Sequence, residues 1–248
     1  CDRIGRMSPS SIVAAFGAHD GITAVVGAGG KKTLMRRLAA ALATPVVTAT
    51  VRIPPIATWV ETLAFTDDPV SAVRAATDWP VGVLAGTDGP DRRVGYPPST
   101  VDAIGALGHP VLVKADGARM RRLKAPGAAE PQLPDSAARV VWVGSVEVVG
   151  APLSAETVHR PERVAAVTGR AAGDPLTVGD LATLATHPQG GRKRVPRDAE
   201  HIVCLNMVDD PDRRRTAEAI ADRIVDHTPG TRVVLTSLIA DDPVVAVH

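Results

Sequence analysis

A glycine-rich turn followed by two lysines and a threonine is the most chemically informative segment of the sequence. It reads VVGAGGKKT over residues 25–33 and joins an apolar run to a helix-like one. Glycines let backbone N–H groups converge on an anion, and a helix N-terminus adds positive potential. A lysine at this turn would reach the β- and γ-phosphates of a nucleotide. We therefore expect a phosphate-binding loop built by Gly27, Ala28, Gly29, Gly30, Lys31, Lys32 and Thr33.

The turn matches the P-loop pattern GxxxxGK[ST] only in part. Placing Gly30 and Lys31 on its GK puts Lys32 where the magnesium-binding hydroxyl belongs. Moving the pattern by one residue restores Thr33 but loses the glycine, and neither alignment has glycine at the first position. Lys31 is therefore the expected stabiliser of phosphate charge, and Thr33 is the fallback magnesium ligand.

Two other interpretations of the turn stay open. A dinucleotide fingerprint, GxGxxG, matches Gly27 and Gly29 but meets Lys32 at its third glycine. Its acidic ribose ligand is also missing, because Thr50 and Arg52 follow the second apolar run. A purely structural glycine turn is the remaining alternative.

Polar residues follow three further apolar runs. Asp116 ends one run, as in a Walker B segment whose carboxylate holds magnesium. Asn206 and Asp209 resemble the guanine-binding NKxD box, with Met207 in place of lysine, and Ser237 follows the last run. Because the carboxyl ends of parallel strands share one sheet edge, we expect these residues and Thr50 beside the phosphate loop.

Composition excludes several classes of protein. The 248 residues carry 28 Lys and Arg against 27 Asp and Glu, only six aromatic residues and two Cys. This balance predicts no nucleic-acid partner, no membrane partner, no disulfide framework and no zinc site. The chain begins at Cys1, which we interpret as an extension before a start at Met7, and we expect a cytoplasmic protein with Cys204 reduced and buried in a strand. Oligomeric state is not indicated.

Alternation of apolar runs with helix-length segments predicts one α/β domain over residues 1–248. Its expected architecture is a three-layer, P-loop NTPase-like fold, with a mostly parallel sheet flanked by helices. An N-terminal extension and leading helix would occupy about residues 1–20, and an inserted helical and loop segment about 144–200. Strands are predicted at 22–26, 46–50, 81–85, 111–115, 139–143, 201–205 and 232–236, helices at 31–43, 161–168, 177–185 and 212–227, and a loop at 86–98.

Several segments together resemble the YqeC family, whose members are regarded as accessory proteins of selenium-dependent molybdenum hydroxylases. The resemblance runs from about Gly21 to Thr236. Its motifs are VVGAGGKKTLM at 25–35, ADGARMRRLKAP at 115–126, EPQLP at 130–134, VHRPE at 158–162, HPQG at 187–190 and LNMVDD at 205–210.

The resemblance implies a nucleotide-binding fold, ATP or GTP with magnesium as cofactors, and a role in maturing a molybdenum hydroxylase or its molybdenum cofactor. Matching positions imply phosphate contacts at the glycine loop and Lys31, and an acidic strand end at Asp116 and Gly117. The segments that follow contribute Arg119, Lys124, Glu130, Pro131, His159 and Arg160.

The basic and histidine-containing motifs have functional and structural interpretations. Arg119 or Lys124 could hold a phosphate, including the phosphate of a molybdopterin-type cofactor, or form part of a solvated basic loop. His159 and Arg160 could contact the ligand or simply begin a helix at Pro161. The basic segment 187–194 is expected to be a mobile loop that closes over a polyanion, or merely an exposed one.

This chain departs from the family pattern at three positions. Lys32 replaces the hydroxyl of GGKTT, Lys114 replaces a glutamate before ADG, and Met207 replaces the lysine of the base box. Two of these changes put a cation where metal or hydroxyl chemistry is expected, so binding is favoured over hydrolysis. The main expectation is a nucleotide-binding accessory protein, with nucleoside triphosphatase activity left open. The alternatives are a non-hydrolysing cofactor scaffold, and a small-molecule kinase or nucleotidyltransferase that acts on molybdopterin.

Overall fold

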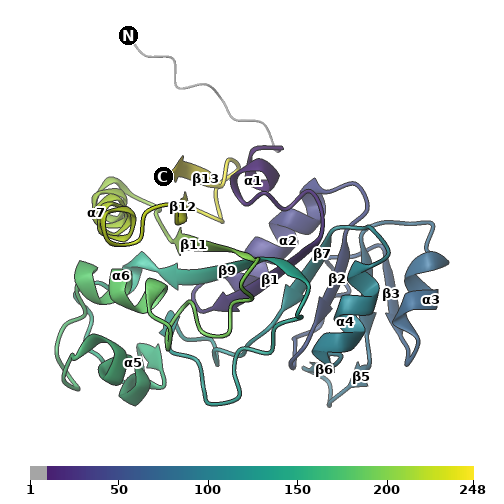
Figure 1. The fold of residues 1–248 in the computed structure, drawn as a ribbon, viewed down its shortest axis with the longest axis horizontal. Coiled ribbons are helices and arrows are strands. Elements are labelled where there is room, and N and C mark those ends of the chain that lie inside the picture. Colours follow the sequence, from purple (N-terminus) through teal and green to yellow (C-terminus); the bar gives the residue numbers. More distant parts are fainter. Residues whose placement is uncertain (1–9) are drawn as a thin grey trace, which may run out of the picture.

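A central nine-stranded sheet organises the computed structural model, which describes residues 10–248 (Figure 1). The interpretation of Cys1 and Met7 therefore lies outside the described residues. The strand order is β13-β12-β11-β9-β1-β7-β2-β4-β3, and every neighbouring pair is parallel except β12 and β13. The strands are β1 (Ile22–Gly27), β2 (Val46–Ala49), β3 (Thr62–Phe65), β4 (Val81–Leu84), β7 (Val111–Lys114), β9 (Ala137–Ser145), β11 (Glu200–Asn206), β12 (Arg232–Thr236) and β13 (Val244–Val247).

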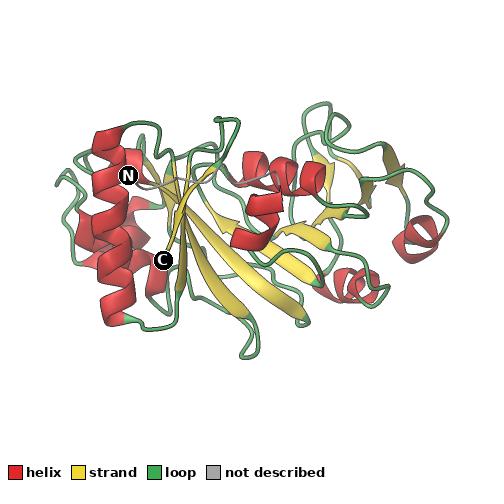
Figure 2. Ribbon diagram, turned by 90° about the horizontal axis from the view of Figure 1, so that it is seen from above, coloured by secondary structure: helices red, strands yellow, loops and turns green. Residues whose placement is uncertain are grey.

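Helices cover both faces of the sheet and make the three layers expected of this α/β fold (Figure 2). Alternation along each strand divides the apolar side chains between two cores. In β1, Ala24 and Val26 pack into one core and Val25 into the other. The core around Val25 includes α1 (Ser10–Ala15) and α2 (Lys31–Ala41). The opposite core includes α3 (Pro69–Arg74), α4 (Pro98–Gly105), α5 (Pro161–Thr168), α6 (Val178–Thr186) and α7 (Pro211–His227).

Local capping explains where several of these helices begin. Asp68 accepts the Ser71 backbone N–H at the start of α3, and Asp210 accepts that of Arg213 at the start of α7. Thr177 and Asp180 form a reciprocal capping box at α6. Each device satisfies N–H groups that have no partner within the helix.

All seven predicted strands occur in the sheet, and the two that the sequence did not reveal lie at its edges. β3 is half-buried or exposed along its length, and β13 is buried only at Val244. The sequence VVAV of β13 is nevertheless an apolar run from which that strand could have been predicted, whereas β3 reads TLAF and has only three apolar residues in succession.

The prediction of a loop over residues 86–98 is wrong. Two short strands, β5 (Gly86–Thr87) and β6 (Arg93–Val94), pair there as an antiparallel hairpin, and α4 begins at Pro98. The Asp88-Gly89 dipeptide between the strands is a recognised hairpin signal, but two-residue strands are too short to show alternation.

Parallel pairing brings the carboxyl ends of β1, β2, β7, β9 and β11 to one edge of the sheet. The strands β2 and β4, which follow β1 in the sequence, lie on one side of it in the sheet. The later strands β9, β11 and β12 lie on its other side. In open α/β sheets, ligands bind where the connections change sides in this way. Among residues 10–248, no helix has the length and apolarity that a bilayer crossing requires.

The close approach of β1 to β9 generates the first prediction. Gly27 has φ +90°, and a Cβ there would lie 2.2 Å from the Val143 carbonyl oxygen. We expect Gly27→Ala to lower the free energy of unfolding by about 3 kcal/mol or more, because backbone clash adds to left-handed strain. Urea denaturation followed by circular dichroism measures the loss.

The matched control is Gly89→Ala. Gly89 also has a positive φ, +75°, but a Cβ there meets nothing within 4 Å. Strain alone predicts a cost of about 1–2 kcal/mol. Equal losses for the two variants would show that the β1–β9 contact does not determine the requirement for glycine.

Candidate functional site

The glycine loop connects β1 to α2 with only three residues, Ala28–Gly30. Gly30 occupies the N-cap with φ 144°, and no side chain of the described residues caps the helix there. The first N–H groups of α2 are therefore oriented toward the loop and free of a side-chain cap, which is the arrangement that binds anions. The loop is shorter than a GxxxxGK loop, because the position of its first glycine falls on Val25 inside the buried strand.

Asn206 braces the loop from β11. Its side-chain N–H donates to the Gly29 carbonyl over 2.7 Å, and its carbonyl oxygen accepts from the Thr236 hydroxyl and the Leu238 backbone N–H. A Cβ on Gly30 would collide with the same amide nitrogen. The polar groups of Asn206 are thus directed at the backbone of the loop.

The other members of the suggested base box lie away from the loop. The Ser237 hydroxyl donates to Asp209 over 2.6 Å, and Arg213 contacts the second carboxylate oxygen of Asp209 over 3.3 Å. Neither Asp209 nor Ser237 lines the cavity described below. Met207, by contrast, does line it, with φ 68° and its sulfur 3.0 Å from the Ser145 hydroxyl.

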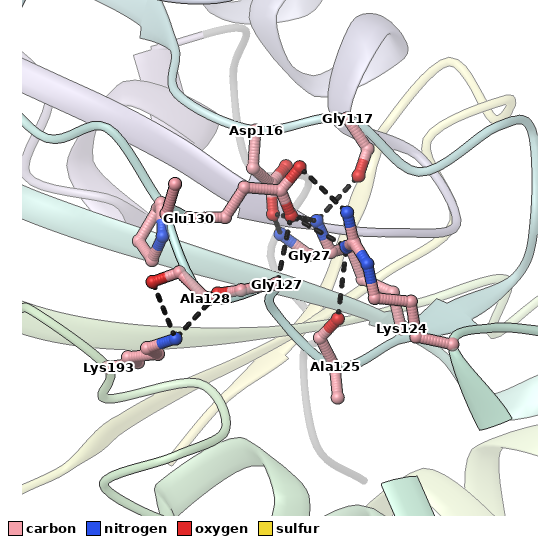
Figure 3. Close-up of polar contacts among 12 residues, drawn as sticks. Gly27, Asp116, Gly117, Lys124, Ala125, Gly127, Ala128, Glu130 and Lys193 are labelled. Carbon is pink, nitrogen blue, oxygen red and sulfur yellow. Dashed lines mark hydrogen bonds and ion pairs between the residues drawn. The ribbon is translucent and has the colours of Figure 1, made fainter. Parts of the chain in front are cut away.

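Next to the loop lies a charge cluster formed by Lys31, Asp116, Lys124, Glu130 and Arg160, of which the first three are buried. Figure 3 labels Asp116, Lys124 and Glu130 of this cluster. Lys31 Nζ forms an ion pair with Asp116 Oδ1 and donates to the Gly27 carbonyl over 2.5 Å. The other oxygen, Asp116 Oδ2, accepts the Gly27 N–H over 2.9 Å and lies 2.9 Å from Lys124 Nζ. Both carboxylate oxygens therefore face a lysine.

The cluster continues through Glu130 to the HRPE segment. Lys124 Nζ donates to Glu130 Oε2 over 2.6 Å. The Arg160 guanidinium donates to both carboxylate oxygens of Glu130, over 2.7 and 3.2 Å. Two short strands, β8 (Leu123–Lys124) and β10 (Val158–His159), pair in parallel and hold the two motifs together. Segments separated by up to 129 positions in the sequence, from Lys31 to Arg160, thus form one network.

Burial and ion pairing compete in setting the pKa values of the cluster. Desolvation alone would raise the pKa of Asp116, but attraction to Lys31 and Lys124 outweighs it and lowers the pKa below the usual range. Desolvation likewise opposes ionisation of Glu130, yet hydrogen bonds from Arg160 and Lys124 bring its pKa down to about 2. Burial lowers the pKa of Lys31, against the pull of Asp116. The two carboxylates are therefore ionised at neutral pH.

An open cavity of about 1010 Å³ lies in front of the loop at the same sheet edge. Among the described residues, nine basic side chains line it against two carboxylates, so basic groups predominate even though four of the nine form ion pairs. The cations are Lys31, Lys32, Arg52, Arg92, Lys114, Arg119, Arg121, Arg122 and Arg160, and the carboxylates are Asp91 and Glu130.

The structure brings ten of the predicted binding residues to this cavity. They are Ala28, Gly29, Gly30, Lys31, Lys32, Thr33, Gly117, Arg119, His159 and Arg160. Gly27, Asp116 and Lys124 lie behind them on a separate small cavity. Thr50 does not line the large cavity, since its hydroxyl donates to the Gln132 carbonyl over 2.6 Å and holds the 130–134 segment.

Three basic residues of the cavity lining, Arg52, Arg92 and Lys114, were not among the predicted site residues. Arg52 follows β2, and Arg92 lies in the turn of the β5–β6 hairpin that was predicted as a loop. Lys114, noted only as a departure from the family, is also part of this lining. Its ammonium is buried and donates to the Arg52 carbonyl over 2.7 Å, and no carboxylate of residues 10–248 pairs with it.

The residues present do not fit a magnesium ion in this arrangement. Lys31 and Lys124 already occupy both oxygens of Asp116, and Thr33 lines a different cavity. Within the described part of the chain, no three His, Cys, Asp or Glu side chains gather into a metal-binding group.

The basic segment 187–194 is fastened to the body of the protein. Lys193 Nζ donates to the Gly127 carbonyl over 2.6 Å, and Arg194 donates to the carbonyls of Ala128, Ala129 and Pro131. The exposed loop expected here is found at Pro188, Gln189, Arg192 and Arg194, but Lys193 and Arg194 also hydrogen-bond to backbone carbonyls of residues 127–131. The segment thereby secures the turn that carries Glu130.

Comparisons with known proteins agree on one family. The family model described as "YqeC protein" matches residues 23–162, more than half of the chain. A protein of Escherichia coli (strain K12) named "Uncharacterized protein YqeC" is 32% identical over 213 residues, which cover 81% of this chain and 82% of that protein. The matched region contains the glycine loop and the whole charge cluster.

The unpaired ammonium of Lys114 predicts a pH-dependent stability. Burial, with a further contribution from the charge of Lys31, lowers its pKa to about 7. Between pH 7 and 9.5 the unfolded chain keeps a proton that the folded protein releases, so stability rises with pH, by up to about 1.4 kcal/mol per pH unit. Lys114→Met removes this contribution and flattens the rise, as urea denaturation from pH 6 to 9.5 will measure.

Arg36→Met serves as the control for this experiment, because it removes an exposed charge from α2 outside the cavity lining. It is expected to retain the wild-type slope. An identical slope in Lys114→Met and wild type would contradict the assignment of this pH dependence to Lys114.

Proposed function

The chain belongs to the YqeC family, and we propose that it binds a nucleoside triphosphate, ATP or GTP, at the glycine loop. The observation that carries the proposal is the uncapped start of α2, with Lys31 as its first residue, opening onto a cavity lined by nine cations. Helix N-terminus, backbone N–H groups and surrounding ammonium and guanidinium groups all favour a compact polyanion.

The charge cluster supports a direct role for Lys31. Three cations face two carboxylates in the cluster, which leaves one positive charge in excess. When a phosphate arrives, Lys31 can turn toward it while Lys124 continues to neutralise Asp116. The buried carboxylate then never stands unpaired, a condition that would cost several kcal/mol.

Base recognition is not part of the proposal. Asn206 braces the loop, and Asp209 and Ser237 bind each other, so none of the three is available as a guanine contact. We expect the phosphates to dominate affinity, with ATP and GTP binding similarly.

A specific observation favours binding without turnover. Asp116, the carboxylate that would organise magnesium for hydrolysis, is occupied on both oxygens by lysines. We therefore propose that the protein holds its ligand as an accessory protein, in preference to the alternative that it hydrolyses a triphosphate. The family resemblance points to maturation of a molybdenum hydroxylase, and the phosphate of a pterin cofactor would meet the same cations.

Titration of ATP and GTP into wild type and Lys31→Ala tests the proposal by calorimetry. Loss of one charge-assisted contact predicts an affinity about 10- to 100-fold lower in the variant. Arg36→Ala is the matched control, since it removes one charge from the same helix on a face outside the cavity and should bind as wild type does.

The proposal fails if wild type binds neither nucleotide, or if Lys31→Ala binds both unchanged. Because Lys31 also pairs with Asp116, circular dichroism must first establish that the variant is folded. Lys32→Ala provides a second variant, as Lys32 lines the cavity without joining the charge cluster, and it should weaken binding by a smaller factor.

A further inference from the structure

Lys124 has an unusual position for a lysine, because its side chain is only 1% exposed. Three oxygens surround its ammonium: Asp116 Oδ2 at 2.9 Å, Glu130 Oε2 at 2.6 Å and the Gly117 carbonyl at 2.5 Å. An ammonium has three N–H donors, so each oxygen can take one. The contacts are those of a fixed cation in an oxygen cage (Figure 3).

Two carboxylates and a carbonyl are also the ligands that hard divalent cations prefer. The cage lies directly behind the glycine loop, since Asp116 Oδ2 also accepts the Gly27 N–H. This is the neighbourhood in which a nucleotide-binding fold of this type would be expected to place magnesium.

We infer that Lys124 takes the place of a divalent cation at this site, so that phosphate binding requires no metal held by the protein. The part of this inference that concerns phosphate binding rests on the proposed function. The cage itself is a property of the protein without ligand.

The neighbouring contacts explain why a lysine can serve this purpose. Arg160 holds Glu130 in place, and the Gly127 N–H donates to the same carboxylate over 3.3 Å. The cage is therefore fixed by other groups, and the ammonium is tethered to the backbone of β8. Such a cation cannot dissociate, so Asp116 stays neutralised whether or not Lys31 is engaged with a ligand.

Removing the lysine should convert the cage into a metal site. The variant Lys124→Ser vacates the position while leaving both carboxylates and the Gly117 carbonyl. Tb³⁺ is a suitable probe, because Trp142 lines the same small cavity as Asp116 and Lys124 and can sensitise its luminescence. We expect stoichiometric Trp-sensitised emission from Lys124→Ser and none from wild type.

Two controls identify the site. Adding Glu130→Gln to Lys124→Ser removes a ligand and should abolish the emission. Lys193→Ser removes a nearby ammonium whose partners among residues 10–248 are backbone carbonyls, and it should behave as wild type does.

Folded Lys124→Ser that gives no emission, or wild type that gives the same emission, would overturn the inference. If Lys124→Ser does not fold, the affinity of wild type for ATP in EDTA and in magnesium decides. Dissociation constants for ATP that agree within about threefold between EDTA and magnesium support the inference. An affinity about tenfold or more weaker in EDTA overturns it. Absence of ATP binding under both conditions would refute the proposed function alone, and the wild-type Tb³⁺ measurement would then decide on the cage.

Discussion

The buried pairing of Asp116 with two lysines is the interaction on which the site depends. An ionised carboxylate away from water is tolerable only when charges and hydrogen bonds compensate it, and Asp116 receives Lys31, Lys124 and the Gly27 N–H. These contacts join the end of β1, the first turn of α2 and the end of β7. The buried carboxylate of Asp116 thus holds both the backbone of the glycine loop, through the Gly27 N–H, and the side chain of Lys31.

The parallel sheet is what makes this convergence possible. Because β1 and β7 are neighbours and run in the same direction, their following loops meet at one edge, and the short β8–β10 pair delivers Arg160 to the same place. The site therefore has two parts, the charge cluster next to the glycine loop and the basic lining of the open cavity. In the first, every carboxylate of the cluster is matched by cations; in the second, an excess of lysine and arginine faces a cavity large enough for a nucleotide.

Features that depend on neighbouring residues, such as strands and helices, could be predicted from the sequence. Contacts between distant segments could not. The central strands appeared as buried apolar runs, and α5 and β12 were predicted at their observed limits. Neither edge strand was predicted, although β13 is the apolar run VVAV, and the two-residue strands of the β5–β6 hairpin are too short to show a pattern. Family motifs indicated Asp116, Lys124 and Arg160 separately, but their mutual pairing depends on contacts across the fold that no spacing reveals. In the same way, the base-box motif drew attention to Asn206, but its hydrogen bond to the Gly29 carbonyl could be seen only in the folded structure.

The central claim is that a phosphate ester binds at the glycine loop without a protein-held metal. Amide chemical shifts of ¹⁵N-labelled wild type during titration with ATP in EDTA test it most directly. The account predicts saturable shifts concentrated at the Ala28–Gly30 loop, the first turn of α2 and Arg119. Shifts that appear only after magnesium is added, or that cluster away from this edge of the sheet, would contradict it.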